Sequence, residues 1–243
     1  MRRVFRFPPL TPFVKKLLIG LAATFVVTLL AEKLAGVPCF ELLALAPTIG
    51  IYSAWQIFTY VLVYPPEPGS VLSLGIGLVF LWWMAGPFEQ RFGATRTVQL
   101  LLVGTVAAGV TTLIAAQLLP SSITFGMSPF YMAIVAGYAI SLPRNARLSF
   151  FGILPLKPMG IIWLFIGLSA LMHIAADDWA GLMGDLAAVG AGVLFMKWIL
   201  RPQRAKPKKK KKNGSRRSHG FRVIEGGADD DDDDDGGPPR YLN

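Results

Sequence analysis

The sequence contains very few of the residues that build disulfide frameworks and metal centres. Among 243 residues there are one cysteine, Cys39, and two histidines, His173 and His219. A single cysteine excludes an internal disulfide framework and a zinc cluster. Two histidines far apart in the sequence make a metal site improbable. We therefore expect no metal and no cofactor.

Charged residues are also scarce, at 16% of the chain, whereas 53% of the residues are hydrophobic. Most of the charges lie in the first sixteen residues and after Arg201. The middle of the chain can bury its apolar side chains only in lipid or against itself. The composition therefore predicts an all-α integral membrane protein whose main partner is the lipid bilayer.

Long apolar runs supply six candidate membrane spans, since a span needs about 20 predominantly apolar residues. We expect them at residues 14–34, 71–88, 97–118, 123–142, 160–175 and 179–200. The first run is not read as a cleaved signal peptide. It is long, lacks a convincing small-residue cleavage site and is followed by further spans.

Two connections differ from simple loops. Residues 36–69 contain several prolines and the aromatic residues Trp55, Tyr60 and Tyr64, which suit a membrane interface. We interpret this stretch as a first loop with helical pieces in the outer leaflet. Residues 148–159 are expected to form a connecting loop, half of it interfacial.

The basic residues predict the orientation, because lysine and arginine concentrate in cytoplasmic loops. With six spans and both termini in the cytoplasm, the inner segments hold nearly all of these residues and the outer segments hold Lys33. The positive ends and short loops are typical of a bacterial inner membrane.

The chain thus divides into a cytoplasmic segment, 1–13, a membrane domain, 14–200, and a charged tail, 201–243, that we expect to be disordered. The tail lysines Lys208, Lys209, Lys210, Lys211 and Lys212 are typical of a stop-transfer and orientation signal. They could also attract anionic lipid. No aromatic residues interleave with them, so no nucleic acid is expected as a partner. The run from Asp229 to Asp235 could fold back onto the lysines.

The stretch around Ser128 is the most informative part of the chain. It places one hydroxyl just inside an apolar run, between Gly126 and Pro129. Gly126 allows close approach of a ligand to the backbone, so Ser128 is a candidate nucleophile if a base lies near it. The alternative is a small residue at a helix contact, with its hydroxyl bonded to a backbone carbonyl.

Several motifs in order resemble the rhomboid intramembrane serine proteases. They are Trp-Gln-Ile-Phe-Thr-Tyr from Trp55, Gly-Pro-Phe-Glu ending at Glu89, Arg-Phe-Gly from Arg91 to Gly93, Gly-Met-Ser ending at Ser128, and Gly-Leu-Met-Gly ending at Gly184. The likeness covers about residues 55–200. It implies a six-helix bundle with a first loop in the outer leaflet.

The resemblance places Ser128 at the nucleophile, but the glycine that usually follows is Pro129, which removes a backbone donor. The general-base histidine falls on Gly181. The positions that assist the oxyanion have also lost their histidines and asparagine; they fall on Tyr64, Ser73 and Gly77.

Other matched positions are structural by the same resemblance. Gly184 is expected to let spans four and six pack closely. Four residues are expected to tie loop one and the base of span two: Trp55, Glu89, Arg91 and Gly93.

Two other groups could activate Ser128. His173 lies eight residues before Gly181 and across an Asp-Asp turn, so we expect an interfacial ring that does not overlay the missing base. Asp185 lies one helical turn beyond Gly181 on the same face. It is either a speculative partner in catalysis or an acid hydrogen-bonded to a neighbour such as Ser128 or Tyr131.

Three functions are compatible with these residues. The first is a rhomboid-like pseudoprotease that binds transmembrane segments of client proteins without cutting them. The second is an intramembrane serine endopeptidase that uses Ser128 with a non-standard base. A small transporter is the third, with Asp185 as its intramembrane acid.

Overall fold

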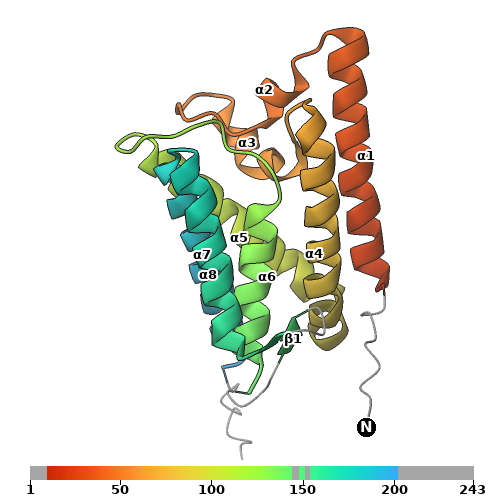
Figure 1. Ribbon diagram of the computed structural model, residues 1–243, viewed down its shortest axis with the longest axis vertical. Helices are drawn as coiled ribbons and strands as arrows, with labels where there is room; N and C mark the ends of the chain where they lie inside the picture. The colour runs from red at the N-terminus through yellow and green to blue at the C-terminus, as the bar shows by residue number, and fades with distance from the viewer. Residues whose placement is uncertain (1–9, 144–147, 151–153, 202–243) are drawn as a thin grey trace, which may run out of the picture. The chain divides into compact units, whose positions relative to one another are not determined.

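The computed structural model describes residues 10–143, 148–150 and 154–201. The expected charged tail, with its lysine and aspartate runs, lies outside these residues except for Arg201, and so does most of segment 1–13. The long helices of the described part are α1 (Pro12–Ala35), α4 (Pro68–Phe92), α5 (Ala94–Ala115), α7 (Pro158–Ala175) and α8 (Trp179–Ile199). Each of these five is long and apolar enough to cross a membrane. Figure 1 shows the chain reversing direction from α1 to α4, from α4 to α5, and again from α7 to α8.

The fourth predicted span is much shorter than expected. Helix α6 (Ser128–Ser141) has 14 residues and begins at Ser128 instead of residue 123. Thr124 and Leu45 form a β-bridge, Gly126 has φ +88°, and Pro129 occupies the first turn of α6. At 1.5 Å per residue, α6 is roughly 20 Å long, which is short of the hydrocarbon thickness. This late start puts Ser128 at a helix N-terminus below a loop.

The first loop contains the helical pieces that the sequence predicts. They are α2 (Cys39–Leu43), α3 (Ser53–Thr59) and a 3-10 turn, η1 (Tyr60–Leu62). Trp55 Nε1 donates to the Leu42 carbonyl at 3.0 Å, and the buried Gln56 side chain bonds three backbone groups of the same loop. These bonds fold the loop onto itself, and Figure 1 shows it at the end of α1 opposite to the N-terminus.

The connection before α7 contains two paired strands, where a loop was expected. Strand β1 (Leu148–Phe150) pairs antiparallel with β2 (Leu154–Leu156), with Ser149 opposite Pro155. The alternation of apolar residues over three positions is too short to distinguish such a strand from a loop in the sequence.

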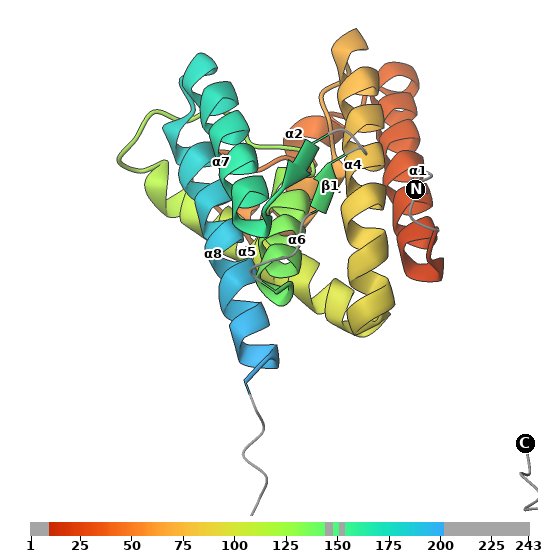
Figure 2. The same cartoon turned by 60° about the horizontal axis from the view of Figure 1, so that its bottom comes forward.

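Helix α6 is at the centre of the bundle. It contacts α4, α5, α7 and α8, and both views show it between α4 and the α7–α8 pair (Figures 1 and 2). Small residues allow this close packing. A Cβ added at Gly104 of α5 would lie 2.5 Å from the Ala133 Cβ, and one at Gly192 of α8 would lie 2.5 Å from the Ala133 carbonyl oxygen.

Gly184 has a different neighbour from the one expected. A Cβ at Gly184 would collide with the hydroxyl of Thr112 and lie 3.1 Å from the Ala108 carbonyl oxygen, both on α5. The contact between spans four and six that was assigned to Gly184 is instead made at Gly192. The spacing of residues in the sequence shows which face of a helix they share. It does not show which neighbouring helix packs against that face.

The C-terminal end of α4 holds neighbouring helices in place. The buried Glu89 carboxylate accepts from the Phe13 and Val14 amides, at 3.1 and 2.9 Å, and from the Thr11 hydroxyl. Arg91 Nη1 donates to Ser141 Oγ at 3.4 Å, at the far end of α6. Gly93, with φ +81°, makes the turn into α5. Glu89 therefore caps the N-terminus of α1, where a negative charge also suits the helix dipole.

Replacing Glu89 with alanine should loosen α1 without unfolding the bundle. The Val14 amide is fully buried, and leaving it without an acceptor costs about 1–3 kcal/mol. We expect faster hydrogen exchange at the start of α1, measured by mass spectrometry. Glu32→Gln on the same helix is the control and should leave exchange there unchanged.

Candidate functional site

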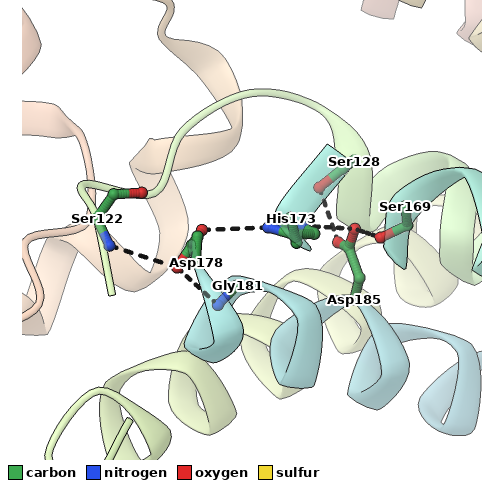
Figure 3. Close-up of polar contacts among 7 residues, drawn as sticks. All are labelled: Ser122, Ser128, Ser169, His173, Asp178, Gly181 and Asp185. Carbon is green, nitrogen blue, oxygen red and sulfur yellow. Dashed lines mark hydrogen bonds and ion pairs between the residues drawn. The ribbon is translucent and has the colours of Figure 1, made fainter. Parts of the chain in front are cut away.

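Ser128 lies at the N-terminus of α6 because the residues before it cannot continue the helix. Gly126 adopts a left-handed conformation, and its amide donates to the Tyr60 carbonyl at 2.9 Å. Ser128 is partly exposed, and its Oγ donates to Asp185 Oδ1 at 2.8 Å. The hydrogen bond that the sequence suggested between these two residues is present (Figure 3).

Asp185 joins three helices through its carboxylate. It is 5% exposed on α8, and its Oδ2 accepts from Ser169 Oγ of α7 at 2.6 Å. The same oxygen lies 3.3 Å from His173 Nε2, also on α7. Side chains from α6 and α7 therefore converge on one buried carboxylate of α8.

His173 bridges Asp185 to a second acid. Its Nδ1 lies 3.2 Å from Asp178 Oδ2, so each ring nitrogen faces a carboxylate oxygen. Ionised carboxylates only accept hydrogen bonds, so both nitrogens must donate and the ring is positively charged. We call Ser128, Ser169, His173, Asp178 and Asp185 the Ser128 cluster.

Asp178 anchors the turn between α7 and α8. Its Oδ1 accepts from the Gly181 amide at 3.1 Å, which caps α8, and from the Ser122 amide at 3.4 Å. Burial alone raises the pKa of this carboxyl, but the bonds from His173, Gly181 and Ser122 outweigh it and hold the pKa below its ordinary value. Asp178 thus stays ionised and holds His173 in place.

Replacing Asp178 with alanine should cost about 1–2 kcal/mol of unfolding free energy, because α8 loses its cap. Asp178→Asn keeps a capping oxygen but loses the charge facing His173. Since the folded pKa is lowered, the charge stabilises the fold above the ordinary pKa, and that stabilisation disappears as the pH falls through the folded value.

Thermal unfolding of wild type and Asp178→Asn should therefore differ at pH 7, and the gap should close only as the pH falls from the ordinary carboxyl pKa of about 4 through the lower folded value. The exposed neighbour Asp177→Asn serves as the control. A gap that persists unchanged at low pH would contradict the assigned role of the Asp178 charge.

The position of His173 corrects the prediction that its ring would lie away from the missing base. A Cβ added at Gly181 would collide with Asp178 Oδ2 and lie 2.5 Å from His173 Cε1 and 2.8 Å from Nδ1. The imidazole from α7 therefore fills the volume next to Gly181. The tight turn between α7 and α8, where Asp177 has φ +50°, brings His173 back over the start of α8.

The residues at the positions expected to assist an oxyanion make other contacts. The Tyr64 hydroxyl accepts from the Met127 amide at 3.3 Å, and burial raises the pKa of this phenol so that it stays neutral. A Cβ at Gly77 would lie 2.7 Å from Met127 Cε, so Met127 fills the space beside it. Ser73 Oγ donates to the Gly69 carbonyl at 3.1 Å. Pro129 has no amide hydrogen to offer.

Two cavities meet at the Ser128 cluster. One, of about 280 Å³, is also lined by Ser122 and Thr124 from the loop before α6. The other, of about 390 Å³, lies between α4, α6 and α7 and is also lined by Ser73, Ile76 and Leu168. Ser128, His173 and Asp185 line both. The cluster is therefore reachable from the loop side and from the side of α4 and α7.

The arrangement does not form a metal centre within the part of the chain that the structure describes. No group of three or more histidine, cysteine, aspartate or glutamate residues there could hold an ion. The cluster can donate and accept hydrogen bonds and can hold charge, and these properties suit recognition of a polar group.

The part of the chain from α3 to α8 matches the model of a known protein family. The family model of the Rhomboid domain matches residues 52–198, which run from just before α3 to the last turn of α8. No curated protein matches the chain.

Proposed function

Because the chain belongs to the rhomboid family, we propose that it is a membrane protein that binds the transmembrane segments of client proteins without cleaving them. The family assignment and the apolar helices establish an integral multi-pass membrane protein.

One observation carries the proposal: the hydrogen bonding of the Ser128 hydroxyl. Its proton is directed at Asp185, which also accepts from Ser169 and His173. A nucleophilic serine needs a base that can take its proton, and the carboxylate of Asp185 is already engaged by two other side chains. His173 has no free lone pair for Ser128, since both ring nitrogens face carboxylates.

The surroundings of Ser128 support the same proposal. An acyl-transfer site needs donors aimed at the developing oxyanion. Here the Met127 amide is bonded to Tyr64, and Pro129 has no amide hydrogen. The cavity beside α4 remains open, so a segment can reach Ser128 although the catalytic donors are absent from these positions.

Photocrosslinking tests the binding. A photoreactive residue at Ser73 or Ile76, both exposed and lining the cavity, should capture an added single-span protein in liposomes. The same residue at Val27, an exposed position of α1, is the control. We expect capture of the intact segment at Ser73 and Ile76. Equal capture at Val27 would argue against a binding site.

A second candidate is a rhomboid-type serine endopeptidase. Its favouring observations are the 2.8 Å between Ser128 Oγ and Asp185 Oδ1 and the imidazole that fills the space beside Gly181. This candidate requires Asp185 to accept the serine proton. It predicts cleavage of a single-span substrate that is lost in both Ser128→Ala and Asp185→Asn.

We also infer the orientation from the basic residues, with both termini in the cytoplasm of a bacterial cell and the Ser128 cluster toward the outer side. Labelling of single cysteines by a membrane-impermeant reagent tests this inference. A cysteine at Tyr52 should react from outside the cell, and one at Gln90 should not.

A further inference from the structure

The Ser128 cluster contains more negative than positive charge. It has two carboxylates, Asp178 and Asp185, and one imidazole that is charged because it donates to both. The residues that line its two cavities include no lysine or arginine. One negative charge is therefore left without a partner in the described part of the site.

This charge lies within a helix that can cross a membrane. Asp185 is six residues beyond Trp179, the first residue of α8, which is about 9 Å along the helix axis. Charged groups at such depth are costly unless they pair with an opposite charge. Asp185 Oδ1 accepts from Ser128 alone among the described residues, so it keeps a lone pair for another donor.

We propose that the client segment carries a lysine or arginine whose charged group binds Asp185 through the cavity between α4, α6 and α7. This inference rests on the proposed client binding and names the class of client. Ile76, Phe80 and Leu168 line the cavity and suit the alkyl stem of a long basic side chain. Ser128 and Asp185 line the same cavity, and Asp185 supplies the charge.

The depth of Asp185 sets the position of the basic residue. The basic residue of the client lies about 9 Å inside the end of the client segment that is level with the turn between α7 and α8. A soluble cation could reach the same carboxylate through the other cavity, which is lined by Ser122 and Thr124. The test must therefore separate a basic membrane segment from a soluble cation.

The experiment uses the full-length protein in nanodiscs of neutral lipid and measures the binding of fluorescent single-span peptides. The peptides are leucine-rich and identical except for one position: lysine at the matched depth, leucine there, glutamate there, or lysine near the opposite end. Spermidine is added as a soluble competitor. The variants are Asp185→Asn and, as a matched control on a helix away from the cavity, Glu32→Gln.

We expect the peptide with lysine at the matched depth to bind about tenfold more tightly than the leucine peptide, because a desolvated charge pair adds affinity. Asp185→Asn should remove this difference and keep the affinity for the leucine peptide, which also shows that the variant is folded. Glu32→Gln should behave as wild type, and spermidine should not compete.

Three results would overturn the inference. They are equal binding of all peptides, a preference for glutamate, and a preference for lysine that ignores depth or persists in Asp185→Asn. Competition by spermidine would assign the site to a soluble cation instead. If no peptide binds, the proposed client binding itself fails, and this outcome is distinct from the others.

Discussion

Replacing Asp185 with alanine is expected to lower the unfolding free energy by about 3 kcal/mol or more, the largest effect of any single substitution in the site. The charged His173 ring, Ser169 and Ser128 all donate to this carboxylate. Removing it leaves the hydroxyls of Ser128 and Ser169 and Nε2 of His173 without their acceptor, and each buried donor left unpaired costs about 1–3 kcal/mol. Thermal unfolding in detergent or a denaturant titration measures the loss.

Two further variants make this prediction specific. Asp185→Asn keeps an oxygen that can accept from Ser128 or Ser169 and should lose less stability than alanine. Glu67→Gln, at an exposed position before α4, should change the stability by less than about 0.5 kcal/mol. If Asp185→Ala were as stable as wild type, the carboxylate would not be the centre of the cluster.

Replacing Gly181 with alanine is expected to destabilise the protein by about 1–3 kcal/mol, because the added methyl group overlaps groups that are already packed. The new Cβ would collide with Asp178 Oδ2 and lie 2.5 Å from His173 Cε1. In a His173→Ala background the same substitution should cost less, since the imidazole is gone. The coupling between the two sites should be on the order of 1 kcal/mol.

Gly190 provides the matched control on the same helix. A Cβ there meets nothing within 4 Å, so Gly190→Ala should stabilise α8 by up to about 1 kcal/mol through helix propensity. Opposite signs at Gly181 and Gly190 would confirm that His173 and Asp178 occupy the space beside Gly181. The same sign at both positions would contradict that packing.

The helices and the helical pieces of the first loop could be predicted from the sequence. Apolar runs of about 20 residues give the long spans, and prolines with interfacial aromatics indicate a broken first loop. The start of α6 could not be predicted, because apolar residues continue through the stretch before Ser128. The bridge between Thr124 and Leu45, which are far apart in the sequence, and the left-handed conformation of Gly126 stop the helix there.

The site was predicted in part. Asp185 could be placed near Ser128 because both positions follow from helical spacing and the family resemblance. The role of His173 could not, because it depends on the angle between α7 and α8. That angle is set by a three-residue turn in which Asp177 adopts a left-handed conformation. Non-glycine residues rarely adopt this conformation, so the spacing alone did not predict a ring placed over Gly181.

The same limit applies to the partner of Gly184. A small residue on α8 indicates a close helix contact, and several helices could provide it. In the structure Thr112 of α5 fills that space, and α6 instead meets Gly192. The sequence shows that Gly181 and Gly184 lie on one face of α8. Tertiary packing decides which side chains meet them there.

The most direct test of the central claim is the reactivity of the Ser128 hydroxyl. The purified full-length protein in nanodiscs would be treated with a fluorophosphonate probe, with Ser128→Ala as the reference for background labelling. Because the proton of Ser128 is held by a carboxylate that accepts from two other side chains, we predict labelling equal to that of Ser128→Ala. Labelling above the reference that is lost in Asp185→Asn would show an activated serine and would contradict a non-cleaving client-binding protein.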